Sequence, residues 1–260
     1  MQNKRIVVKI GTSTLAHPSG LLNIRQVESL CKVLSDLKNA GHELILVSSG
    51  AIGMGVGKLS LSRRPEDMPT KQAAAAVGQC ELMYTYDKLF LQYNHTVAQV
   101  LLTGEDVDHP ERRENFENTM ERLLELGALP VINENDTIAT AEIKVGDNDT
   151  LGAIVACCTK ADLLVLLSDI EGLYTADPRK DPDAKLIPTV EEVTPEIEAL
   201  AGGVGSSLGT GGMATKLRAA KMVTAQGCDM VITNGERVED LYRIVRGEAV
   251  GTRFAGTLQG

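Results

Sequence analysis

The sequence predicts an α/β protein, a three-layer αβα sandwich with a mainly parallel central sheet. Short apolar runs rich in β-branched residues alternate with segments whose apolar residues recur at helical spacing. Glycine and other turn residues stand at the joins between them. Strands that alternate with helices usually pair in parallel, so this order predicts one sheet with helices on both faces.

Local patterns place each element. Residues 5–10 form a strand by their β-branched content, and residues 23–40 form a helix that Asn23 can cap and Gly41 can end. The expected strands are 5–10, 43–47, 96–102, 129–132, 162–167, 229–233 and 251–255. The expected helices are 23–40, 71–93, 111–126, 194–200, 213–226 and 238–245, with another that Asn148 could cap and that runs through residue 155. Neither an internal repeat nor a break in composition is visible, so residues 1–260 are expected to form a single domain.

Composition and charge argue against several classes of partner. The formal net charge of -9 and the sequence pI near 5.0 disfavour nucleic acid and anionic membranes. No apolar run approaches the roughly 18 residues of a spanning helix, and the run at residues 6–8 is too short for a signal sequence. The five cysteines are odd in number and contain no C-x-x-C pair, which is typical of reduced thiols. We therefore expect a cytoplasmic protein that binds neither membrane nor nucleic acid.

The stretch from residue 129 to residue 150 carries the strongest functional signal. The apolar run 129–132 leads into Asn-Glu-Asn-Asp at 133–136, and Asp-Asn-Asp-Thr follows at 147–150. These residue types have poor strand propensity, and ligands of open α/β sheets bind at the carboxyl ends of strands. Carboxylates recognise an ammonium group, while carboxamides can donate to a carboxylate or phosphate. The two clusters therefore favour a small zwitterion such as an amino acid; the alternative is a pair of hairpin turns rich in Asn and Asp.

Two lysines and their glycine-rich surroundings indicate a second, anionic ligand. Lys9 ends an expected strand beside a Gly/Thr/Ser loop rich in amide donors, although an edge-strand lysine could instead face solvent. Residues 202–216 form a glycine-rich segment that opens a helix and suits phosphate, the alternative being a flexible linker. It is not a Walker loop, because Lys216 is followed by Leu217 rather than by Ser or Thr. Two such lysines would neutralise charge on a transferring phosphoryl group.

The sequence lacks the residue patterns of several other catalytic sites, which limits the reactions that we expect of the protein. None of the four histidines lies in a pattern with a hydroxyl or thiol, so an acyl-transfer triad finds no support. A side-chain carboxylate acceptor has an ordinary pKa of about 4.3 and needs no general base at neutral pH. No His/Cys cluster has metal spacing, so we expect no protein metal site and Mg²⁺ held mainly through nucleotide phosphates.

Seven segments follow one another along almost the whole chain: V-K-I-G-T-S, V-S-S-G-A-I, K-Q-A-A-A-A-V-G-Q, P-V-I-N-E-N-D, A-E-I-K-V-G-D-N-D, G-L-Y-T-A-D-P-R and G-T-G-G-M-A-T-K. As a set they resemble the glutamate 5-kinase family, whose members have the amino acid kinase fold. The resemblance implies ATP-dependent phosphorylation of the γ-carboxylate of L-glutamate to γ-glutamyl phosphate, the first step of proline biosynthesis. Many members carry a C-terminal PUA domain; this sequence ends at Gly260, and we expect none in it.

The resemblance also implies roles for individual residues. Lys9 and Lys216 would stabilise the transferring phosphoryl group, and Asp149 would orient both lysines. The residues expected to hold glutamate are Ser49, Asn133, Asp136, Asp147 and Asn148. The residues expected to surround ATP are Lys9, Ser168, Asp169, Thr210, Gly211, Gly212, Met213, Ala214, Thr215 and Lys216. The family often has Thr where this chain has Ser168, which keeps the hydroxyl.

Further expectations concern partners and rival functions. The resemblance implies feedback inhibition by L-proline, a homo-oligomer (dimer or tetramer) and a possible functional partner, glutamyl phosphate reductase. One rival is another amino acid kinase, for N-acetylglutamate, aspartate or carbamate, but acidic Asp136 suits the free ammonium that N-acetylglutamate lacks. The other is a non-catalytic amino acid sensor, which would not require both Lys9 and Lys216.

Overall fold

The computed structural model describes residues 3–17, 21–139, 145, 147–201 and 212–257. Within them, eight strands form one sheet in the order β3-β4-β2-β1-β5-β7-β8-β6. Every neighbouring pair is parallel except β7 and β8, which are antiparallel. The strands are β1 (Arg5–Ile10), β2 (Glu43–Val47), β3 (Val97–Leu102), β4 (Leu129–Glu134), β5 (Leu163–Ser168), β6 (Thr189–Val190), β7 (Asp229–Asn234) and β8 (Thr252–Phe254).

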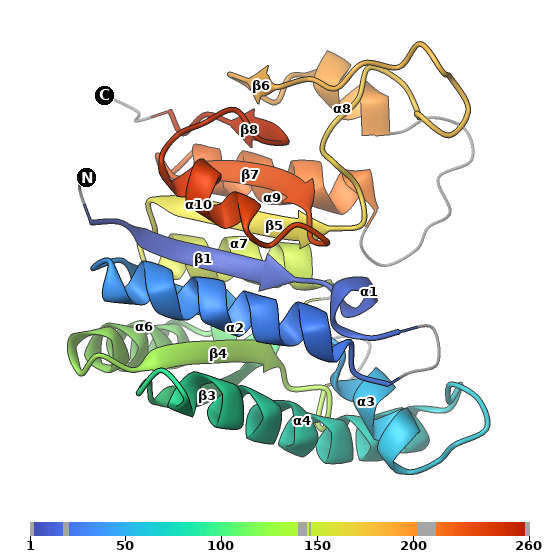
Figure 1. The fold of residues 1–260 in the computed structure, drawn as a ribbon, viewed down its shortest axis with the longest axis vertical. Coiled ribbons are helices and arrows are strands. Elements are labelled where there is room, and N and C mark those ends of the chain that lie inside the picture. The colour runs from blue at the N-terminus through green and yellow to red at the C-terminus, as the bar shows by residue number, and fades with distance from the viewer. Residues whose placement is uncertain (1–2, 18–20, 140–144, 146, 202–211, 258–260) are drawn as a thin grey trace.

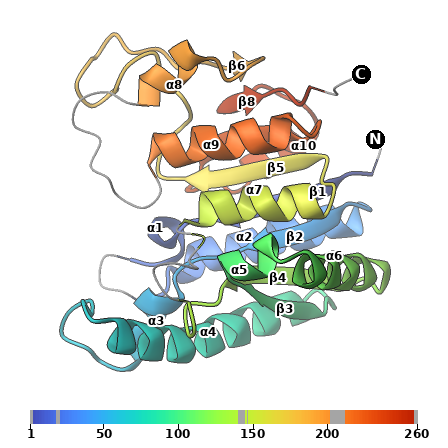
Figure 2. The same ribbon diagram turned by 180° about the vertical axis from the view of Figure 1, so that it is seen from behind.

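Helices cover both faces of the sheet (Figures 1 and 2). One face carries α2 (Ile24–Asn39), α4 (Met68–Leu91) and α10 (Asp240–Val245), and the other carries α6 (Pro110–Glu125), α7 (Asn148–Cys158) and α9 (Met213–Thr224). The short helices are α1 (Thr12–Leu15), α3 (Ala51–Lys58), α5 (Gly104–Asp108) and α8 (Pro195–Ala201). The predicted αβα sandwich is confirmed.

The two helical layers follow from the pleat of the buried strands. Ile6 and Val8 of β1 pack with α2 and α4, while Val7 packs with α7 and α9. Successive side chains of a strand point to opposite faces, so a strand buried on both faces must be apolar throughout. This is why Lys9, which shares the α7 face with Val7, stands out in β1.

The strand order reverses at β1. Strands β2, β3 and β4 all lie on one side of β1, and β5 pairs with its other side. Chain segments that follow β1 and β2 therefore meet those that follow β4 and β5 at one edge of the sheet. In open α/β sheets a crevice forms at such a reversal, outside the carboxyl ends of the strands.

Three expectations of the local analysis are wrong. No helix was expected at residues 51–58, where the structure has α3, because its three glycines give this segment low helix propensity. Helix α7 is capped by Asp147, whose side chain accepts from Thr150 N, and Asn148 is its first helical residue. Helix α4 begins at Met68, before the expected start at residue 71, because the Asp67 side chain caps it by accepting from Thr70 N.

Helices α3 and α4 cross with their backbones in direct contact. A Cβ atom added at Gly55 would lie 1.8 Å from Ala74 O, and one added at Gly78 would lie 1.7 Å from Ala51 O. Only glycine permits this approach. Ala51 directly follows the loop of Ser48, Ser49 and Gly50, so the crossing fixes where that loop leaves β2.

We expect Gly55→Ala to lower the free energy of unfolding by at least about 3 kcal/mol, because the new methyl group would overlap a backbone carbonyl. The midpoint of thermal unfolding should fall by about 6 °C or more. Gly53→Ala is the matched control in the same helix, since a Cβ there meets Thr12 Cγ2 at 3.9 Å. It should leave stability unchanged or raise it by up to about 1 kcal/mol. Equal stability of the two variants would contradict the crossing.

Candidate active site

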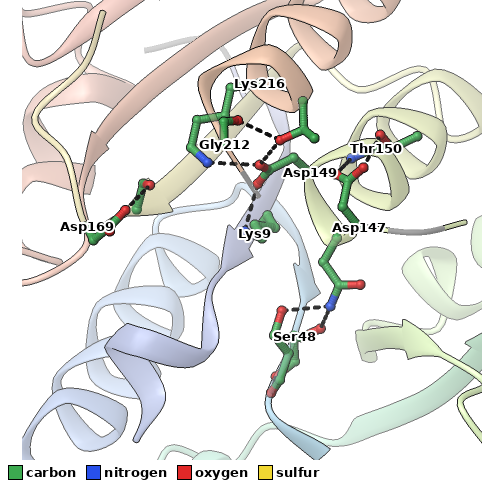
Figure 3. A network of polar contacts seen from close by, with 12 residues as sticks. Lys9, Ser48, Asp147, Asp149, Thr150, Asp169, Gly212 and Lys216 are labelled. Atoms are coloured by element: carbon green, nitrogen blue, oxygen red, sulfur yellow. Dashed lines mark hydrogen bonds and ion pairs between the residues drawn. The ribbon is translucent and has the colours of Figure 1, made fainter. Parts of the chain in front are cut away.

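A carboxylate lies between two buried ammonium groups at the reversal of the sheet. Asp149 Oδ1 is 2.7 Å from Lys9 Nζ, and Asp149 Oδ2 is 2.9 Å from Lys216 Nζ (Figure 3). Lys9 is the penultimate residue of β1, Asp149 lies in the first turn of α7, and Lys216 is the fourth residue of α9. The exposed fractions of the three residues are 8%, 1% and 3%. The structure thus brings together the three residues predicted to act on the phosphoryl group.

The electrostatics of this triad favour an anionic ligand. Burial alone would raise the pKa of the Asp149 carboxyl, but the Lys9 and Lys216 ammonium groups outweigh it and hold that pKa below its ordinary value. The triad therefore carries one net positive charge in a region of low dielectric. A net positive charge is costly to bury without a negative partner, and a bound phosphate group would be such a partner.

An amide cluster lies beside the triad, after β2 and β4. Asn148 Nδ2 donates to Ser48 O and to Ser49 Oγ, each at 2.6 Å, and Asn133 Oδ1 lies 3.2 Å away. Figure 3 shows Ser48 below the helix end that holds Asp147 and Asp149. Three of the predicted glutamate-binding residues, Ser49, Asn133 and Asn148, therefore lie in one hydrogen-bonded group.

The two remaining predicted glutamate residues are placed differently. Asp147 accepts from Thr150 N at 2.7 Å and from Thr150 Oγ1 at 2.8 Å, so its carboxylate caps α7. Asp136 lies half-buried in the turn that follows β4. Glu134, which ends β4, is buried, and its Oε1 accepts from Val145 N at 2.7 Å. Asp147 thus has a structural function as the cap of α7, which was expected of Asn148.

The predicted nucleotide-binding residues flank the triad. Ser168 ends β5, and its hydroxyl donates to Asp169 Oδ1 at 3.1 Å. Gly212 precedes α9, whose first residues are Met213, Ala214 and Thr215. The hydroxyl of Thr215 donates to Asp149 Oδ2 at 3.0 Å, which joins this helix end to the triad. Thr210 and Gly211 lie outside the described residues.

Two buried polar residues that were not predicted from the sequence as site residues support the amide cluster. Gln79 of α4 accepts from Asn133 Nδ2 through its Oε1 at 3.0 Å, and the Tyr86 hydroxyl lies 2.9 Å from Ser48 Oγ. Burial raises the pKa of the Tyr86 phenol, so it stays protonated. Gln79 occupies the packed side of α4 together with Leu82. A polar residue on a buried helical stripe was the signal that could have found it.

Neither a metal-binding cluster nor a membrane-spanning helix occurs in the part of the chain that the structure describes. The described residues contain no group of three or more His, Cys, Asp or Glu side chains that could hold a metal ion. Among these same residues, every helix is too short or too polar to cross a membrane.

The comparison with protein families settles the membership of this chain. The family model described as the amino acid kinase family matches residues 4–234. The chain belongs to the amino acid kinase family. Among similar proteins, the glutamate 5-kinase of Clostridium perfringens is 53% identical over 97% of this chain and 95% of its own length. That of Clostridium acetobutylicum is 55% identical, covering 96% and 94%. That of Listeria monocytogenes serovar 1/2a is 52% identical, covering 97% and 93%. The predicted resemblance to glutamate 5-kinases is confirmed.

Solved structures of two other kinases share the fold. Carbamate kinase from Giardia lamblia bound to AMP-PNP superposes with a TM-score of 0.71 at 18% identity, covering 98% of this chain and 99% of that one. Isopentenyl phosphate kinase from T. acidophilum, solved as a product complex, gives 0.64 at 18% identity, covering 96% and 99%. The predicted amino acid kinase fold is confirmed.

Asp149→Asn should lower the free energy of unfolding at neutral pH by about 3–5 kcal/mol, because two buried ammonium groups would lose the carboxylate between them. The folded-state pKa of Asp149 is depressed, so its contribution is present above the unfolded value of 3.8 and is lost as pH falls through the folded value. Urea unfolding from neutral to acid pH should therefore show the difference between wild type and variant shrinking below pH 3.8.

The control for this experiment is Asp147→Asn, which removes a carboxylate at the cap of the same helix. Asn caps a helix about as well as Asp, so this variant should stay within about 0.5 kcal/mol of the wild type across the series. A difference between wild type and Asp149→Asn that stays constant with pH would refute the ion pairing.

Proposed function

We propose that this chain is an ATP-dependent glutamate 5-kinase that phosphorylates the γ-carboxylate of L-glutamate to γ-glutamyl phosphate in proline biosynthesis. The observation that carries the proposal is the adjacency of two sites on the first turn of α7: Asp149 holds the two lysines, and Asn148 joins the amide cluster. An anion site and an amino acid site one residue apart suit transfer of a phosphoryl group to an amino acid. Identities of 53% and 55% to glutamate 5-kinases support the same substrate.

The chemistry requires positioning and charge stabilisation from this chain. An oxygen of the ionised γ-carboxylate would form a bond to the γ-phosphorus while the bond from that phosphorus to the β–γ bridging oxygen breaks, releasing ADP. The acceptor is already ionised, so no residue has to remove a proton. Lys9 and Lys216 would stabilise the charge on the transferring oxygens, and Asp149 would hold both ammonium groups in place.

Recognition of the amino acid would involve Ser49, Asn133, Asp136 and Asn148. The amino hydrogens of Asn148 are directed at protein acceptors, so its Oδ1 is the atom it offers to a ligand. An acceptor at this place, with the Asp136 carboxylate after the same strand as Asn133, favours a ligand that carries an ammonium group. Asp147 would contribute by holding the helix end that bears Asn148 and Asp149.

The nucleotide would lie on the other side of the triad. The amino end of α9, from Gly212 to Ala214, would present backbone N–H groups suited to phosphate, and Ser168 and Asp169 would border the nucleotide. Thr210 and Gly211 are proposed to belong to the same loop. Mg²⁺ bound to the nucleotide would neutralise charge on the phosphate oxygens. The nucleotide phosphate oxygens would supply most of its ligands.

Several expectations stay predictions. They are feedback inhibition by L-proline, a dimeric or tetrameric assembly, transfer of the product to glutamyl phosphate reductase, a single domain over residues 1–260 and a cytoplasmic location. An acyl phosphate is readily hydrolysed, which supports a reductase acting directly after this enzyme.

Purified protein incubated with ATP, Mg²⁺ and hydroxylamine should form an acyl hydroxamate with L-glutamate, because hydroxylamine traps an acyl phosphate before water does. N-acetylglutamate, which lacks the ammonium group, should give none. Omission of ATP is the control. A signal with N-acetylglutamate alone would keep the reaction type and overturn the substrate. The absence of signal with either acid would overturn the proposed reaction.

Lys216→Ala should lower kcat for glutamate by about 100- to 1,000-fold, since one group that stabilises the transferring phosphoryl charge is removed. Lys221→Ala is the control on the same helix: its ammonium lies 2.6 Å from Glu198 and is exposed. That variant should keep the wild-type kcat within about twofold, because an exposed ion pair contributes little. Unchanged turnover in Lys216→Ala would refute the role given to this lysine.

A further inference from the structure

A chain of carboxamides runs from the edge of the sheet to the amino acid site. Gln99 Oε1 accepts from Gln79 Nε2 at 3.2 Å, and Gln79 Oε1 accepts from Asn133 Nδ2 at 3.0 Å. Asn133 Oδ1 then lies 3.2 Å from Asn148 Nδ2, which donates to Ser49 Oγ at 2.6 Å. The chain begins on edge strand β3, passes through α4 and β4, and ends at α7 and the loop after β2.

Two backbone groups identify which atom of Asn148 and of Asn133 is the amide oxygen and which is the nitrogen. The carbonyl of Ser48 can only accept, so the atom of Asn148 that lies 2.6 Å from it must be the amino nitrogen. The backbone N–H of Glu134 can only donate, so the atom of Asn133 that lies 2.9 Å from it must be Oδ1. Asn133 must therefore turn its amino group to Gln79, which in turn must present Oε1.

Burial makes this arrangement specific. Gln79 is 7% exposed and Asn133 is 2% exposed, so neither amide can exchange its partner for bulk water. Buried polar groups that lose a partner carry the full cost of desolvation, and hydrogen-bonded chains of this kind hold their members in one orientation. Packing alone would not require glutamine at position 79, since the same side of α4 carries Ala75 and Leu82.

We infer that Gln79 is a positioning residue for the amino acid substrate. It holds the Asn133 amide, and through it the Asn148 amide, in the orientation in which Asn148 offers Oδ1 to the substrate ammonium. Gln99 supports Gln79 from the sheet edge. The inference rests on the proposed function, because it assigns these amides to the glutamate side of the site rather than to the lysine triad.

Gln79→Met keeps the length and volume of the side chain and removes its acceptor. We expect KM for glutamate to rise by about tenfold, the factor that corresponds to one buried amide left without its partner. The lysines do not take part in the amide chain, so kcat and KM for ATP should each stay within about threefold of wild type. Gln92→Met, at the exposed end of α4, is the matched control and should change none of these parameters.

Gln99→Met provides a second test that does not depend on a core substitution. Gln99 is exposed on an edge strand, so this variant should fold, and KM for glutamate should rise by a smaller factor of about two to four. Unchanged KM for glutamate in Gln79→Met would overturn the inference. A fall in kcat together with equal rises in KM for glutamate and for ATP would also overturn it, because that result indicates a structural role only. If Gln79→Met does not fold, an unchanged KM in Gln99→Met overturns it.

The activity of the wild type with glutamate distinguishes a failure of this inference from a failure of the proposed function. Failure of the wild type to phosphorylate glutamate overturns the proposed substrate. The comparison of variants is then made on the acceptor that the wild type uses, and a selective rise in KM for that acceptor still supports the role of Gln79.

Discussion

The carboxylate of Asp149 holds two like charges together inside the protein, and much of the site depends on it. Lys9 and Lys216 are far apart in the sequence, and both contact this side chain. Without it, two ammonium groups in a medium of low dielectric would repel each other. The ion pairs therefore connect β1, α7 and α9 at the carboxyl edge of the sheet. They also leave one positive charge in excess, which supports the proposal that a phosphate group binds here.

Three consecutive residues at the start of α7 have three different functions in the site. Asp147 caps the helix, Asn148 enters the amide cluster and Asp149 contacts the lysines. Successive residues of a helix point in directions about 100° apart, so one turn can serve all three purposes. In the proposed function, the spacing between the amino acid and the phosphoryl group would then be set by the geometry of one helical turn.

The helices behind the proposed amino acid site support it. The contact of α3 with α4 at Gly55 and Gly78 fixes the loop that bears Ser48 and Ser49. Gln79, the residue after Gly78, reaches Asn133 from the same helix. A single close crossing of two helices therefore positions both a backbone acceptor for Asn148 and the amide chain that orients it.

The sequence by itself determined whatever depends on local pattern. The bounds of β1 and β2 and the cap of α2 at Asn23 follow from alternation, helical spacing and side-chain capping, which act within a few residues. Lys9 and Lys216 were also identifiable, because a charged residue in an otherwise apolar strand or beside a glycine-rich turn stands out without any structure.

Tertiary structure alone decided the rest. Both Asp147 and Asn148 could cap α7, and the choice depends on Ser48 and Ser49, which draw Asn148 away from the helix end. Helix α3 forms despite its glycines because its backbone packs on α4. The position of Gln79 matters only because Asn133, from another element, donates a hydrogen bond to it. Each of these outcomes depends on contacts between residues far apart in the chain, whose energies exceed the local propensities that a sequence displays.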